Sequence, residues 1–281
     1  MKSATNNVSV KLFLLQVSIF FLAFSCGETA DATVESNAKD SSRMSAAAPE
    51  PVTKNASITD TAKTVYLTFD DGPLNGTQAI IEVLDKEQLP ATMFMVGHNM
   101  ELNTITRTNF DLASKDKLLE IGNHSYSHAN NHYKEYYDNP KAVVQDFDKN
   151  QQLLKFSDKD GRMPGRNTWR VAGRKKDDAA SNGSEAADLL QKAGYSLFGW
   201  DLEWQHQSNG TPIQTVQQMF LEIERTIADP NKCFTPYHFV LLSHDEMFRK
   251  PWEESELKQL VELLKSKGYK FDHIDNYPRN K

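Results

Sequence analysis

The sequence predicts an α/β protein with a parallel sheet covered by helices, and three observations lead to this prediction. First, short apolar segments with strand composition alternate with amphipathic segments of helical spacing. Second, polar clusters follow several predicted strands, which is where catalytic groups gather in barrel folds. Third, no glycine-rich phosphate loop follows any predicted strand, which argues against a nucleotide-binding sheet. The pattern therefore favours a closed barrel over an open, doubly wound sheet.

Size and composition exclude several classes of protein. The chain has 281 residues, enough for one large domain with a substantial core or for two small ones. Its 39% hydrophobic and 25% charged residues are ordinary for a globular protein. The net charge is −6 and no basic stripe is visible, so we expect no nucleic-acid partner. We also expect a monomer.

The N-terminus has the features of an export signal. Lysines precede an apolar run over residues 12–24, which is too short and too early for a convincing membrane span. Cys26 follows a small residue directly after this run, as in a bacterial lipoprotein signal, although Ala23 stands where leucine is usual. We expect an exported protein of the bacterial cell envelope, anchored in the membrane by a lipid on Cys26. Ordinary signal cleavage, or a disulfide between Cys26 and Cys233, stays open.

A polar stretch separates this signal from the rest of the chain. Residues 27–60 are rich in Ala, Ser, Thr, Glu, Asp and Asn and hold few large apolar side chains, so they cannot bury enough surface to fold. The chain therefore divides into a signal segment (1–26), a flexible linker (27–60) and a folded domain (61–281).

The first predicted strand ends at two adjacent carboxylates. Val65, Leu67 and Phe69 alternate with other β-forming residues, and the glycine and proline after the acids cannot continue the strand. Successive side chains of a strand point in opposite directions, so Asp70 and Asp71 can hold different tasks.

The elements that follow alternate in type along the chain. They are a helix at 77–87, a strand at 91–96, a helix at 112–119, a strand at 118–121, helices at 140–156 and 186–193, a strand at 195–200, a helix at 215–228, a strand at 239–242, a helix at 254–267 and a strand at 269–274. The charged stretch 167–182 is expected to be a solvated surface loop that shapes the substrate groove.

Two histidines four residues apart follow one of these strands. On a helical turn, His124 and His128 lie on one face and can share one ion. A carboxylate from another strand end completes a set of two nitrogens and one oxygen, which suits a catalytic zinc with an open position. The same set suits non-haem iron.

Five ordered segments of this chain resemble the motifs of the polysaccharide deacetylase family, also called the NodB-homology domain or carbohydrate esterase family 4. The segments are Thr68-Phe69-Asp70-Asp71-Gly72-Pro73, His124-Ser125-Tyr126-Ser127-His128, Arg162-Met163-Pro164, Asp201-Leu202-Glu203-Trp204 and Leu242-Ser243-His244. The resemblance extends from about Thr64 to the C-terminus. It implies a deformed (β/α) barrel with seven parallel strands.

The resemblance also implies a role for each matching residue. Asp71, His124 and His128 would bind a divalent metal, most simply Zn, with Co, Ni or Mn as alternatives. The catalytic residues would be Asp70 as general base, Arg162 as its orienting partner, His244 as general acid, and Asp201 or Glu203 as the acid that orients His244. Substrate would be bound by Pro164, Gly165 through its backbone N–H, Trp204 and Leu242.

Two positions depart from the family pattern. Gly165 stands where many members have an aromatic residue, and Glu203 stands where aspartate is usual. Asp201 and Glu203 lie on the same side of the predicted strand, so the sequence does not decide which of them faces His244.

The expected function is removal of N-acetyl groups from a polysaccharide containing N-acetylglucosamine, such as peptidoglycan, chitin-like oligomers or an exopolysaccharide. Three alternatives remain open. They are an O-acetyl esterase of the acetyl xylan type, a non-haem iron oxygenase, and a glycan-binding module without catalysis.

Overall fold

The computed structural model describes residues 63–178 and 182–279. The predicted signal segment, Cys26 and the linker lie outside these residues. None of the described helices has both the length and the hydrophobicity that crossing a bilayer requires.

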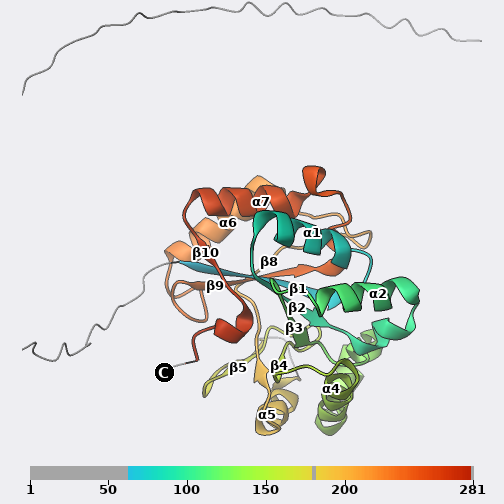
Figure 1. Ribbon diagram of the computed structural model, residues 1–281. Coiled ribbons are helices and arrows are strands. Elements are labelled where there is room, and N and C mark those ends of the chain that lie inside the picture. The colour runs from blue at the N-terminus through green and yellow to red at the C-terminus, as the bar shows by residue number, and fades with distance from the viewer. Residues whose placement is uncertain (1–62, 179–181, 280–281) are drawn as a thin grey trace, which may run out of the picture. The chain divides into compact units, whose positions relative to one another are not determined.

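The described chain forms one mixed sheet with helices packed around it (Figure 1). The strands are β1 (Thr64–Gly72), β2 (Ala91–Met95), β3 (Leu119–Asn123), β4 (Asp160–Gly161), β5 (Trp169–Val171), β6 (Arg174–Lys176), β7 (Ser196–Leu197), β8 (Leu202–Glu203), β9 (His238–His244) and β10 (Lys270–Phe271). Their order is β6-β5-β7-β4-β3-β2-β1-β9-β8, with β10 also paired to β1. The sheet is a deformed barrel, as predicted, but it is open rather than closed, because the end strands β6 and β8 are not paired to each other.

Helices cover the outer face of this sheet. They are α1 (Thr77–Glu87), α2 (Thr104–Ala113), α3 (Tyr133–Tyr137), α4 (Pro140–Leu154), α5 (Ser184–Lys192), α6 (Val216–Ala228) and α7 (Glu256–Ser266), with short 3-10 turns η1 (Gly97–Glu101), η2 (His128–Asn131), η3 (Asp245–Met247), η4 (Trp252–Glu254) and η5 (Ile274–Asn276). In Figure 1, α1, α6 and α7 lie together beside β1 and β9, and α4 and α5 lie beside each other at the opposite side. The predicted helix at 112–119 is wrong, because α2 begins earlier, at an Asn103 cap, and ends at Ala113.

The alternation of side chains along β1 separates the outer core from the barrel interior. Val65, Leu67 and Phe69 pack into the large core under the helices. Tyr66 belongs to a second cluster inside the barrel, together with aromatic residues of other strands. Because side chains alternate with a period of two, Asp70 continues the interior row that Tyr66 begins. The alternation that builds the core therefore also directs the carboxylate of Asp70 into the barrel interior.

Strand β9 repeats this arrangement next to β1. Leu241 packs into the outer core and Val240 into the barrel interior. The two strands are parallel, and their register sets Asp70 opposite His244. Two polar side chains that are far apart in sequence thus reach the same end of the sheet.

The charged stretch at 167–182 differs from the expected surface loop. β5 and β6 form an antiparallel hairpin within it, and β5 pairs with β7. Trp169 is fully buried and stacks on Phe234 with ring centroids 4.3 Å apart. Arg170 is also buried and binds Asp177 and Asp188, each at 2.7 Å. Within this hairpin, the charged residues predicted solvent exposure correctly only for β6, whose last two residues are exposed.

Candidate active site

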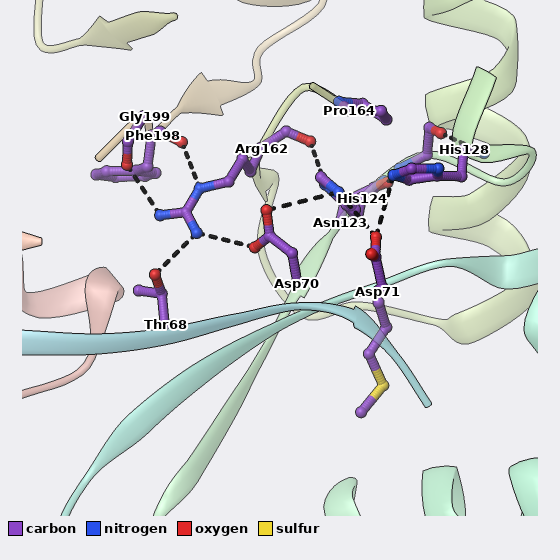
Figure 2. A network of polar contacts seen from close by, with 12 residues as sticks. Thr68, Asp70, Asp71, Asn123, His124, His128, Arg162, Pro164, Phe198 and Gly199 are labelled. Carbon is purple, nitrogen blue, oxygen red and sulfur yellow. Dashed lines mark hydrogen bonds and ion pairs between the residues drawn. The ribbon is translucent and has the colours of Figure 1, made fainter. Parts of the chain in front are cut away.

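Asp70 lies in the barrel interior and is held by a buried arginine. Its Oδ1 accepts a hydrogen bond of 2.8 Å from Nη1 of Arg162 (Figure 2). Arg162 is fully buried, and Asp70 is only 3% exposed. Burial raises the pKa of Asp70, while Arg162 opposes this shift. The result is a buried carboxylate of fixed orientation and increased basicity, as a general base requires.

The guanidinium of Arg162 has more partners than Asp70 alone. Nη1 also donates to Oγ1 of Thr68 at 2.8 Å, Nε to the carbonyl of Phe198 at 3.0 Å, and Nη2 to the carbonyl of Gly199 at 2.8 Å. These bonds join β1 to the segment after β7, as Figure 2 shows. Arg162 therefore cannot turn away from Asp70 without leaving several buried acceptors unpaired.

Asp71 points in a different direction because the end of β1 is irregular. The pairing with β2 shifts register between Phe69 and Gly72, and Asp71 has a φ of 72°. Nδ2 of Asn99 donates to the carbonyl of Asp71 at 2.7 Å, which holds this unusual backbone conformation. The carboxylate of Asp71 is turned towards the two histidines (Figure 2).

The two histidines meet Asp71, but they do not share a helical turn. His124 directly follows β3, and His128 begins η2 with a φ of 49°. The expected helical spacing was therefore wrong, although the pair does converge. Oδ1 of Asp71 lies 3.0 Å from Nε2 of His128 and 3.5 Å from Nε2 of His124. Nδ1 of His124 lies 2.8 Å from the carbonyl of Arg162 and donates to it, because a carbonyl can only accept.

These three side chains fit a divalent metal. One ligand atom from each of Asp71, His124 and His128 lies within 4.8 Å of the others. Oδ1 of Asp71 is buried and has no hydrogen-bond donor among the described residues. The hydrogen bond from Nδ1 of His124 leaves its Nε2 free, which is the usual arrangement of a metal-binding histidine. An unpaired buried carboxylate oxygen beside two imidazole nitrogens is a donor set that suits a divalent metal ion.

The histidines and Asp71 also shift one another's protonation. Burial lowers the pKa of His124 to about 3, and the neighbouring His128 adds to this. Burial alone would raise the pKa of Asp71, but the imidazole of His128, whose Nε2 lies 3.0 Å from Oδ1 of Asp71, outweighs it and lowers this pKa. A neutral His124 and an ionised Asp71 are the forms that bind metal.

His244 reaches the site from β9, but neither expected acid orients it. The carboxylate of Asp201 accepts bonds from the backbone N–H groups of Phe234 at 2.7 Å and Val240 at 2.8 Å. Glu203 makes no hydrogen bond to His244 either, and Nδ1 of His244 is buried without a partner among the described residues. The prediction that Asp201 or Glu203 orients His244 is therefore corrected. It considered only on which side of the strand the two acids lie, and not the backbone N–H groups that bind Asp201. The ring beside His244 is His206, with centroids 4.7 Å apart.

The residues predicted to bind substrate divide into two groups. Pro164 and Gly165 follow Arg162 at the site, and the N–H of Gly165 donates to no described residue. Leu242 lies on the interior side of β9, 3% exposed. Trp204 was predicted wrongly, because its ring is completely buried in the outer core and Nε1 donates to the carbonyl of Gln214 at 2.9 Å. It cannot offer a face to a sugar.

Asp245 and Tyr133 are residues of this site that sequence reasoning missed. The buried carboxylate of Asp245 accepts bonds from the N–H of Gly76 at 2.7 Å and from the hydroxyl of Thr77, which ties the loop after Asp71 to the end of β9. Asp245 directly follows His244 in the sequence, and this position could have identified it as a residue of the site. Tyr133 packs edge-on against His128, and its ring lies 3.0 Å from where a β-carbon of Gly165 would stand. No pattern in the sequence indicated that Tyr133 and Gly165 lie close together.

A deformed barrel that brings three possible metal ligands and a buried Asp–Arg pair to its strand ends fits the hydrolase class. Comparison with known proteins agrees with the class. The family model described as polysaccharide deacetylase matches residues 57–195. The resemblance to the polysaccharide deacetylase family that the motifs predicted is thus confirmed over these residues.

Similar proteins include one sequence and two solved structures. The chain is 24% identical to a chitin disaccharide deacetylase of Vibrio alginolyticus, covering 79% of this chain and 73% of that protein. The catalytic domain of a peptidoglycan N-acetylglucosamine deacetylase of Eubacterium rectale superposes with a TM-score of 0.57 at 22% identity, covering 83% of this chain and all of that one. A Streptococcus mutans CE4 esterase gives 0.55 at 25% identity, covering 75% and 86%.

Proposed function

We propose that this protein is a metal-dependent hydrolase that removes N-acetyl groups from a polysaccharide containing N-acetylglucosamine. The observation that carries the proposal is that two adjacent aspartates have different main partners, although Nε2 of His124 lies near both, 3.6 Å from Oδ2 of Asp70 and 3.5 Å from Oδ1 of Asp71. Asp71 faces two histidines, and Asp70 faces Arg162. One carboxylate is thus available to a metal and the other to a proton.

The amide bond of an N-acetyl group requires an activated water and a protonated leaving nitrogen. A divalent metal held by Asp71, His124 and His128 would polarise the carbonyl and lower the pKa of water to about 7. Asp70 would take the proton from the attacking water, a contribution of about 10²–10⁴ in rate. The N–H of Gly165 would donate to the developing oxyanion, worth about 3 kcal/mol.

His244 would protonate the departing nitrogen. It lies opposite Asp70 on the neighbouring strand, so the two groups flank one reaction centre. Burial lowers the pKa of His244, and Asp71 and Asp70 oppose this shift. A lowered pKa makes the protonated imidazole a stronger acid, which favours transfer to a poor leaving group.

The test is acetate release by the purified protein from acetylated chitooligosaccharides and from peptidoglycan. We expect release that stops after chelation and returns with zinc or cobalt. Equal release from untreated and chelated protein would contradict metal dependence. Release from O-acetylated xylan alone would replace the amide substrate by an ester one. Export and lipid attachment at Cys26 stay predictions, which the acyl mass on the mature N-terminus would test.

A further inference from the structure

The N–H of Gly165, proposed above as an oxyanion donor, lies at the centre of a tight turn. The N–H of Arg166 donates to the carbonyl of Met163 at 3.1 Å, which closes a four-residue turn with Pro164 and Gly165 at its second and third positions. Gly165 has a φ of 60°. Proline at the second position and a positive φ at the third are the features of a type II turn. A type I turn of the same residues would have the central peptide rotated by about half a revolution.

This central peptide contributes the carbonyl of Pro164 and the N–H of Gly165. It is trans, because the cis peptide bond found among the described residues lies elsewhere, between Gly72 and Pro73. In a trans peptide the carbonyl and the N–H lie in one plane and point in opposite directions. The direction of the Pro164 carbonyl therefore fixes the direction of the Gly165 N–H, and rotation of the peptide would reverse both.

The hydroxyl of Tyr137 holds the carbonyl of Pro164 in place. It donates to this oxygen at 2.7 Å, and the side chain of Tyr137 is buried. Rotation of the central peptide would remove the acceptor of this hydroxyl and leave a buried polar group unpaired, which is costly. The hydrogen bond therefore stabilises the type II turn, with the N–H of Gly165 directed away from Tyr137.

A second tyrosine of α3 packs against Gly165 itself. Atoms Cε1 and Cζ of Tyr133 lie 3.0 and 3.2 Å from where a β-carbon of Gly165 would stand. The ring of Tyr133 is also nearly perpendicular to that of His128, with centroids 5.9 Å apart. Helix α3 begins two residues after η2, the turn that His128 begins. One short helix thus joins the turn of a possible metal ligand to the turn of the proposed oxyanion donor.

We propose that Tyr137 is a positioning residue for the reaction, because its hydroxyl keeps the N–H of Gly165 directed at the developing oxyanion. The inference rests on the proposed function, which takes this N–H as the oxyanion donor. Its effect belongs to the transition state, since a donor aimed at the oxyanion binds the uncharged carbonyl less well. It applies to amide and ester substrates alike, because both pass through a tetrahedral oxyanion.

The experiment compares two tyrosine-to-phenylalanine variants of the full chain, both loaded with zinc. Tyr137→Phe removes the hydroxyl that binds Pro164. The matched control, Tyr195→Phe, removes a buried hydroxyl that donates to Oδ1 of Asp148 at 2.9 Å, next to the amino end of β7. Acetate release gives kcat and KM. Calorimetry gives the affinity for a glucosamine trimer with methylphosphonamidate groups in place of its acetamide groups, whose tetrahedral phosphorus and charged oxygen imitate the oxyanion.

We expect Tyr137→Phe to lower both kcat and the affinity for the phosphonamidate by about tenfold. This is less than the 10²–10³ in kcat typical of a lost oxyanion donor, because the peptide is released but not removed. KM and zinc content should stay at wild-type values, and Tyr195→Phe should change none of these quantities. Equal kcat in the two variants would overturn the proposal, as would a change confined to KM.

A second variant tests the same peptide without touching Tyr137. Gly165→Ala disfavours the positive φ of the type II turn and places a β-carbon against the ring of Tyr133. It should lower kcat and phosphonamidate affinity by about tenfold or more. Because both changes act on one peptide, their losses should not multiply in the double variant. Multiplied losses, or wild-type kcat in Gly165→Ala, would contradict the proposal. Absence of acetate release by the zinc-loaded wild type from amide and ester substrates would instead contradict the proposed function.

Discussion

The two ends of the parallel strands both bury carboxylates, but they surround them differently. Near the amino end, both oxygens of Asp160 are bound by Arg279. Glu120 accepts bonds from Oγ1 of Thr92 at 2.6 Å and from the N–H of Asp275 at 3.1 Å. At the carboxyl end, Oδ1 of Asp71 is buried without a donor.

The difference distinguishes carboxylates that stabilise the fold from those available for chemistry. The C-terminal segment after β10 crosses the amino end of the strands and supplies donors to its acids. None of the described segments does this for Asp71, and a cavity lies beside it. A buried anion without donors is costly unless a cation binds it. Asp71 is therefore the carboxylate of this end that is available to a cation, whereas Asp70 is already bound by Arg162.

The largest expected effect comes from breaking the carboxyl end at Asp70. We expect Asp70→Asn to lower kcat by about 10²–10⁴, because the amide still accepts from Arg162 but cannot take a proton. Bound zinc should remain stoichiometric. The comparison variant His124→Ala should lose both zinc and activity. Unchanged kcat in Asp70→Asn would refute its assignment as the base.

A smaller effect, on stability alone, is expected from Arg279→Gln at the amino end. This change leaves Asp160 buried without its cation, which should cost about 2–3 kcal/mol of unfolding free energy after allowance for the partly exposed arginine. Urea unfolding measures this cost, and kcat should not change. Arg225→Gln, on the exposed face of α6, is the matched control. A drop in kcat at full stability would show that the two ends are coupled.

The smallest expected effect is a change in pH dependence at Glu120. Burial raises the pKa of this carboxyl to about 7 from an ordinary value near 4.5. The folded state therefore holds a proton that the unfolded state has released, so stability falls as pH rises from about 4.5 to 7. Glu120→Gln should remove this loss, on the order of 2 kcal/mol at pH 8. Unfolding curves at pH 5 and pH 8 test it, and a pH dependence of stability in Glu120→Gln equal to that of the wild type would contradict this assignment.

The sequence predicted the elements whose patterns are local. The alternation in Val65 to Phe69 predicted β1 and the divergence of its two aspartates, and the motifs predicted the family. It failed where partners distant in the chain decide. Trp204 was assigned to substrate because no local pattern shows that its ring packs against Phe248 and donates to the carbonyl of Gln214. The hairpin of β5 and β6 was predicted to be a loop because the stretch around it has few apolar residues.

The sequence by itself thus determined the barrel class, the resemblance to the family and the residues proposed to hold metal and proton, since these follow from periodicity and from motifs of adjacent residues. Only the tertiary structure decided how those residues are used. The register of β1 and β9 set Asp70 opposite His244, and the backbone N–H groups of Phe234 and Val240 bind the carboxylate of Asp201. Register and backbone hydrogen bonds join segments far apart in the chain, so no local pattern of residues encodes them.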